Sequence, residues 1–239
     1  MSGPVRRRRP WRRVARRAIP VALGIGLAAT LAMALQVREV RVVGVHRFPA
    51  SEVEAALRGA LGMPTIAARA DELRGVVRRI AWVADATVRV SLDGVLTCRV
   101  SERTPFAVAR DGTAASLVDA EGNGLGPCGP GAAPLEIEGF AAFPEERATA
   151  LAAVPALERR WGARLERVER IGPRDVALHF AATVPTLVAD PANPAALADA
   201  RRVLAAWLTT YKLAPARLDV RVAGRVTVLP APPADGEGS

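Results

Sequence analysis

The sequence predicts an α+β protein in which a single transmembrane helix precedes two small domains of mixed helix and strand. Residues 18–37 contain no charged side chain, and such a segment is long enough to cross a membrane. The β-α-α-β-β order of patterns behind it, followed by short strands separated by turn residues, indicates the two domains. Half of the 239 residues are hydrophobic, which is too high a share for a disordered chain.

The first 17 residues form an arginine-rich tail that accounts for most of the net charge of +9. No acid precedes Glu39, and eight of the 33 Lys and Arg residues lie in the tail: Arg6, Arg7, Arg8, Arg9, Arg12, Arg13, Arg16 and Arg17. The other 25 basic residues nearly balance the 24 acids, so the charge does not indicate a nucleic-acid-binding protein. Positive residues flank the cytoplasmic ends of membrane helices, and these arginines are therefore expected to keep the N-terminus in the cytoplasm.

The uncharged segment at 18–37 is predicted to be the transmembrane helix, with membrane lipid around it. Its 20 residues, rising about 1.5 Å each, cover the roughly 30 Å hydrocarbon core of a bilayer. Small residues recur every four positions and predict a packing face for another membrane helix, formed by Ala18, Ala22, Gly26, Thr30 and Ala34. An Ala-rich span without a helix partner is the alternative to that face. The alternative to a retained anchor is a signal peptide cleaved after Ala34, because Ala32-Met33-Ala34 fits the small-x-small cleavage pattern.

The first extracytoplasmic domain is predicted over residues 38–103. A strand at 37–43 is followed by Ser51-Glu52-Val53-Glu54, a capping box that predicts a helix start. A second amphipathic helix begins near Asp71. Two further strands at 86–90 and 95–101 flank an Asp-Gly turn.

The second domain is predicted over residues 104–229 as a mixed, mainly antiparallel β domain with helices. Strands are expected at 106–110, 116–118, 165–171, 175–181, 185–189, 218–222 and 225–229. Residues 122–134 are rich in Gly and Pro and predict a loop. Helices are expected at 145–161, with a kink or break at Pro155, and at 194–208. The Pro/Gly-rich, acidic end at 230–239 predicts disorder.

The sequence gives no indication of catalysis, and no catalytic residue, metal site or cofactor is predicted. The only histidines, His46 and His179, are far apart and have no cysteine or acid at metal-ligand spacing. Carboxylate pairs such as Glu136 and Glu138 are explained more simply as a solvated face. Whether Cys98 and Cys128 form a disulfide depends on a Cα distance below about 7 Å, which the sequence does not give.

Binding is the remaining class of function, and the terminal strand pair is its best candidate. A strand at the end of a sheet exposes unpaired N–H and C=O groups that a partner strand can use. Arginines beside its turn could bind carboxylates of that partner. The predicted partner-binding residues are Leu218, Val220, Arg221, Arg225, Val226 and Val228. The alternative is a hairpin that only closes the domain.

Several short strings, in this order along the chain, resemble the bacterial cell-division family FtsQ/DivIB. They are Val40-Arg41-Val42-Val43-Gly44, Ala81-Trp82-Val83-Ala84-Asp85-Ala86, Glu102-Arg103-Thr104-Pro105-Phe106-Ala107, Leu117-Val118-Asp119-Ala120-Glu121-Gly122 and Leu218-Asp219-Val220-Arg221. The chain departs from the family pattern at Ser91-Leu92-Asp93-Gly94-Val95-Leu96 and at Ala189-Asp190.

The resemblance implies that residues 38–103 are a POTRA domain and that the protein is a non-enzymatic scaffold of the inner membrane at the division septum. It implies strand addition at the last strand by a coiled-coil protein of the FtsB or FtsL kind, and contacts with FtsK-, FtsW- or FtsI-like proteins. The edge of the POTRA sheet is a second surface that could accept a peptide. The alternative function is an exported, soluble POTRA-type chaperone or transport component. No nucleic acid and no small-molecule substrate are expected as partners.

Overall fold

The computed structural model describes residues 23, 24, 26, 30, 35–128, 133–181, 184–222 and 224–231, and the chain divides into two compact units between Glu102 and Arg103. None of the helices described is both long and apolar enough to cross a membrane. Of the 20 residues of the predicted transmembrane segment only 23, 24, 26, 30 and 35–37 are described, and the whole arginine-rich tail lies outside the described residues. Of the predicted packing face only Gly26 and Thr30 are described, and the Thr30 hydroxyl donates to the Gly26 carbonyl at 2.8 Å.

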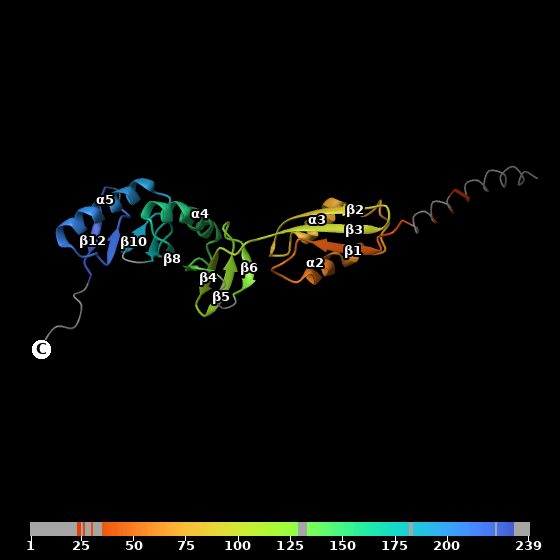
Figure 1. The fold of residues 1–239 in the computed structure, drawn as a ribbon, viewed down its shortest axis with the longest axis horizontal. Helices are drawn as coiled ribbons and strands as arrows, with labels where there is room; N and C mark the ends of the chain where they lie inside the picture. The colour runs from red at the N-terminus through yellow and green to blue at the C-terminus, as the bar shows by residue number, and fades with distance from the viewer. Residues whose placement is uncertain are drawn as a thin grey trace, which may run out of the picture. The chain divides into compact units, whose positions relative to one another are not determined.

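The first unit is a three-stranded sheet with strand order β1-β3-β2 (Figure 1). Strand β3 pairs in parallel with β1 and antiparallel with β2. Its elements are β1 (Glu39–Val43), α2 (Ala50–Leu57), η1 (Arg58–Ala60), α3 (Ala70–Val77), β2 (Val83–Val90) and β3 (Val95–Glu102). The predicted β-α-α-β-β order is therefore present.

The core of the first unit lies between this sheet and its helices. Leu57 of α2, Val77 of α3 and Leu96 of β3 are fully buried in it. Val37, predicted as the last residue of the membrane segment, is also buried in this core. The predicted capping box is wrong in detail: α2 begins at Ala50 after Pro49, and no side chain caps it, so Ser51 is an exposed helical residue.

The second unit is built on a nine-stranded mixed sheet with strand order β12-β11-β10-β9-β8-β7-β4-β5-β6. Its strands are β4 (Ala107–Asp111), β5 (Ala114–Val118), β6 (Gly124–Pro127), β7 (Leu135–Glu138), β8 (Leu165–Arg170), β9 (Val176–Phe180), β10 (Thr186–Ala189), β11 (Arg217–Asp219) and β12 (Thr227–Leu229). Most neighbouring pairs are antiparallel, while β4–β7, β7–β8 and β10–β11 are parallel. The predicted loop at 122–134 contains β6, which pairs with β5.

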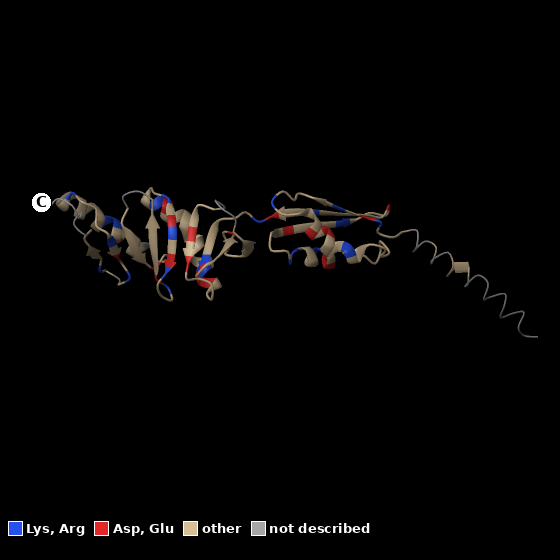
Figure 2. Cartoon of the chain, turned by 90° about the horizontal axis from the view of Figure 1, so that it is seen from below, with Lys and Arg blue, Asp and Glu red and all other residues tan. Residues whose placement is uncertain are grey.

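Helices α4 (Pro144–Trp161) and α5 (Pro194–Tyr211) pack against one face of this sheet. Pro155 lies inside α4, and the helix continues through it, so the predicted break is absent. Leu151 and Leu197 from the two helices join Ile137 and Leu187 from the sheet in one buried cluster. The opposite face carries charged residues on its central strands, as Figure 2 shows.

Candidate functional site

Strand β12 is the last strand of the nine-stranded sheet and pairs with β11 on one side only. The Ala216 N–H donates to the Leu229 carbonyl at 2.9 Å, so the carbonyl of Leu229 faces inward. Backbone groups alternate in direction along a strand, which places the N–H and C=O of Val228 on the outer side. This outer side is free of strand pairing within the described residues, and its backbone groups are available to a partner.

The side chains predicted for this edge fall into two groups. Leu218 and Val220 are buried in the core, and Val226 and Val228 are half-buried against it. Leu218 and Val220 therefore pack the terminal strands against the core, and their side chains are not accessible to a partner. The side chain of Leu229, which the sequence reasoning did not single out, is 57% exposed. Leu229 is an apolar residue at the end of the terminal strand, and this is the signal that could have identified it.

The two predicted arginines also differ in their surroundings. Arg221 binds the Asp219 carboxylate through its Nε at 3.0 Å and its Nη2 at 2.7 Å. The Arg221 hydrogen bond holds the pKa of Asp219 below its ordinary value and outweighs the opposing effect of burial. Arg225 is exposed, and its side chain has no ion pair in the described part of the chain. Of the two, Arg225 is the guanidinium available to an acidic partner.

The other end of the sheet, strand β6, is an edge of a different kind. Its sequence is Gly124-Leu125-Gly126-Pro127, and its pairing with β5 is irregular near Leu117 and Val118. Pro127 has no N–H to offer, and glycine weakens a strand. This edge is poorly suited to accept another strand.

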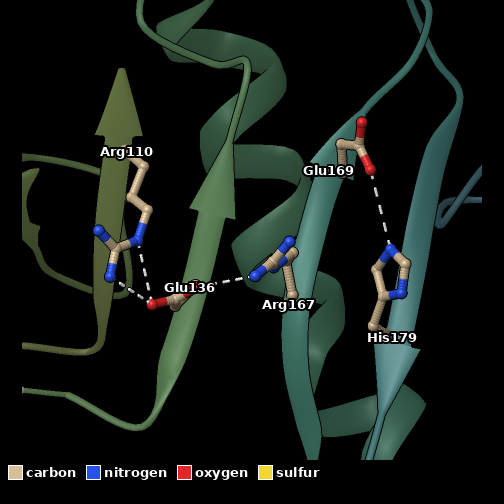
Figure 3. Close-up of polar contacts among 5 residues, drawn as sticks. All are labelled: Arg110, Glu136, Arg167, Glu169 and His179. Carbon is tan, nitrogen blue, oxygen red and sulfur yellow. Dashed lines mark hydrogen bonds and ion pairs between the residues drawn. The ribbon is translucent and has the colours of Figure 1, made fainter. Parts of the chain in front are cut away.

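A row of alternating charges crosses the helix-free face of the sheet (Figure 3). Glu136 on β7 is bound by Arg110 on β4 at 2.7 Å and by Arg167 on β8 at 3.4 Å. The Arg110 hydrogen bond lowers the pKa of Glu136. His179 on β9 lies 3.8 Å from Glu169 through its Nε2. Because Arg110 and Arg167 neutralise Glu136 at the surface of the sheet, the row is a solvated polar face.

A buried ion pair lies where the second unit begins. Arg103 binds the Asp119 carboxylate at 2.5 Å, and Asp119 also accepts the backbone N–H of Asn123 at 2.7 Å. Burial alone would raise the pKa of Asp119, but the Asn123 hydrogen bonds and the Arg103 ion pair together lower it. Glu102, the preceding residue, accepts the backbone N–H groups of His46 and Arg47 in the first unit. Two of the family-like strings thus meet at the Arg103–Asp119 pair.

Potential chemistry is sparse in the part of the chain that the structure describes. No cluster of His, Cys, Asp and Glu with the composition of a metal site is found among these residues. No disulfide joins Cys98 and Cys128 there, and burial raises the pKa of the Cys98 thiol.

Comparison with protein families identifies the first unit. Residues 35–103 match the family model of the POTRA domain, FtsQ-type. The first unit is an FtsQ-type POTRA domain. Over these residues the match supports the resemblance to the FtsQ/DivIB family and indicates a division-related role in protein interaction. A comparison with curated proteins found no match.

Besides the β12 edge, the POTRA domain has edges of its own at β1 and β2. Strand β2 carries an irregularity between Val83 and Asp85, and Asp85 binds Arg74 of α3 at 2.7 Å. Bulges and charges of this kind discourage pairing at an edge. Within the described residues the pairing of β12 with β11 shows no irregularity of this kind, and β12 is therefore better suited to accept another strand than β2.

Proposed function

We propose that this protein is a non-enzymatic, single-pass scaffold of the inner membrane that gathers division proteins at the septum. The FtsQ-type POTRA domain supports the division role in general. The observation that carries the specific mechanism is β12, a terminal strand whose outer backbone groups are unpaired among the residues described. A partner segment adds to the sheet there as a further strand.

The edge offers both a backbone template and side chains for recognition. Val228 supplies an outward N–H and C=O, while Leu229 presents an exposed apolar side chain. Arg225 supplies a guanidinium, which can bind a carboxylate through two parallel hydrogen bonds. The fitting partner is an extended segment that carries an acid and an apolar residue. A coiled-coil division protein of the FtsB or FtsL kind is the partner that the family resemblance suggests.

The N-terminal sequence supplies the membrane part of the proposal. Eight arginines precede an uncharged segment, a pattern that keeps the N-terminus in the cytoplasm and places the POTRA domain outside. Contacts of the POTRA domain and of the membrane segment with FtsK-, FtsW- or FtsI-like proteins complete the proposed scaffold. No catalytic step is assigned to any residue.

Complementation of a depletion strain tests the proposed function. Depleted cells are expected to filament without septa, and the wild-type gene and Val228→Ala to restore division. Val228→Pro removes the outward N–H and is expected to fail, although the protein still reaches the membrane. Normal septation after depletion would show that the division role is wrong. Full rescue by Val228→Pro would show that strand addition is wrong.

A further inference from the structure

Residues 35–37 are part of the folded POTRA domain. The Thr65 N–H donates to the Leu35 carbonyl at 2.8 Å, and Val37 donates to the Met63 carbonyl at 2.9 Å. Gly62 donates in turn to the Val37 carbonyl at 2.9 Å. Two of the last three residues of the uncharged 18–37 segment, Leu35 and Val37, are thus hydrogen-bonded into the folded domain.

A second loop lies against the same point of entry. Arg38 donates its N–H to the Gly94 carbonyl at 2.8 Å. Gly94 has a φ of +87°, and a Cβ added there would lie 2.4 Å from the Gln36 carbonyl oxygen. Only glycine permits this close approach. The loop at 61–66 and the β2–β3 turn at 91–94 are therefore both fixed beside residues 35–38.

These two loops expose large apolar side chains. Ile66 is 84% exposed and Leu92 is 72% exposed. Leu61 and Met63 are exposed as well. Apolar side chains exposed together next to the end of a membrane-length segment are typical of a surface that meets lipid. We call Leu61, Met63, Ile66 and Leu92 the apolar tip.

We propose that the apolar tip of the POTRA domain contacts the lipid surface on the outer side of the membrane. This inference rests on the proposed membrane anchor. Since residues 35–37 belong to the domain, 17 uncharged residues remain, and a helix of that length covers only about 25 Å. Such a short span brings its outer end to the hydrocarbon boundary, and the tip with it.

Basic residues beside the tip favour the same occupant. Arg58 of η1 precedes the loop at 61–66, and Arg69 follows it. Both side chains are exposed, and the Arg69 guanidinium also forms an ion pair with Glu72 at 3.0 Å. Guanidinium groups close to the membrane surface attract the headgroups of anionic phospholipids.

Depth-dependent quenching tests the proposal on the full chain, reconstituted into vesicles of phosphatidylcholine and phosphatidylglycerol. An environment-sensitive fluorophore is attached to single cysteines that replace Ile66 or Leu92, in a Cys128→Ser background that retains the buried Cys98. Val43→Cys is the matched control, because Val43 is also an exposed apolar residue but lies four residues farther along β1, about 13 Å from its start. A probe at Leu27→Cys, measured with lipids that carry the quencher deep in the acyl chains, reports on the anchor separately, because position 27 lies near the middle of the proposed span.

Lipids that carry a quencher near the headgroup are expected to quench the probes at 66 and 92 at least about threefold more than the probe at 43. Equal, weak quenching at 43, 66 and 92 overturns the proposal. When position 27 is quenched in that case, the anchor stands and only the tip contact is wrong. An unquenched probe at position 27 contradicts the anchor. If the probes at positions 66 and 92 are unquenched as well, both the anchor and the tip contact are wrong.

Discussion

The two ends of the nine-stranded sheet are both short strand edges, yet they differ in residue composition and in the regularity of their pairing. Strand β6 contains two glycines and a proline, and its pairing with β5 is irregular. Strand β12 contains no proline, has an outward-facing Val228 backbone and exposes Leu229 beside it. One edge is blunted against pairing and the other is open to it.

The turns that lead into the two edge strands also differ. The turn that leads into β6 is held by the buried Asp119, which Arg103 and Asn123 bind. Strand β12 is joined to β11 by a turn that contains Gly224 with a φ of +70°. The comparison indicates that the sheet is poorly suited to pairing at β6 and, among the described residues, free to pair at β12. This difference is the basis for proposing β12 as the partner-binding edge.

The largest effect is expected from Val228→Pro compared with Val228→Ala. Both variants lose the half-buried valine side chain, but only proline also removes the outward N–H. Affinity for the FtsB-like partner of the same organism is expected to fall about 100-fold for proline and less than about fivefold for alanine. Titration calorimetry measures the affinity, and circular dichroism controls for the fold. Equal losses for the two variants would contradict strand addition.

The next effect tests the β6 end of the sheet. Asp119→Asn weakens the bond to Arg103 and is expected to lower the free energy of unfolding by about 2 kcal/mol at neutral pH. Affinity for the partner at β12 is expected to stay unchanged. Urea unfolding and the same binding titration measure the two quantities. A large loss of affinity would show that the two ends are coupled.

This difference between wild type and Asp119→Asn is expected to depend on pH. The folded pKa of Asp119 lies below its unfolded value of about 3.9, so its ionised form stabilises the fold above that pH. The stabilisation is lost as pH falls below about 4 through the folded pKa. Urea unfolding at pH 7 and at pH 3 measures the change. A constant difference at both values would contradict the assigned role of the carboxylate.

The smallest effect separates the two arginines at the open end. Arg225→Ala is expected to weaken partner binding about threefold to tenfold, because its side chain has no ion pair within the described residues. Arg221→Ala is expected to change affinity less than about twofold, since Asp219 already binds that guanidinium. Titrations at low and high salt measure both. The reverse order of losses would contradict the assignment of Arg225.

The sequence predicted the POTRA domain well because its helices and strands carry strong local patterns. It placed Val37 both at the end of the membrane segment and at the start of the first strand, since an apolar side chain fits lipid and a protein core equally well. It treated residues 124–127 as loop because Gly and Pro dominate them, whereas pairing with β5 makes them a strand. Pairing between distant segments is not encoded in a local pattern.

The candidate site shows the same limit. The sequence correctly located the terminal strands, although their observed bounds are shorter. It did not separate Leu218, which is buried, from Leu229, which is exposed, because both are apolar residues near a strand end. It also did not show that the Arg221 guanidinium is already bound to the Asp219 carboxylate. Both distinctions depend on which strands lie on each side of these residues in the sheet.

Amide hydrogen exchange on the complex tests the central claim most directly. The partner is expected to slow exchange of the Val228 amide at least about tenfold and to leave the Leu125 and Gly126 amides of β6 unchanged. Such a result would place the added strand on the outer side of β12. Unchanged exchange at Val228, with protection at β6 or only in the POTRA domain, would contradict the account.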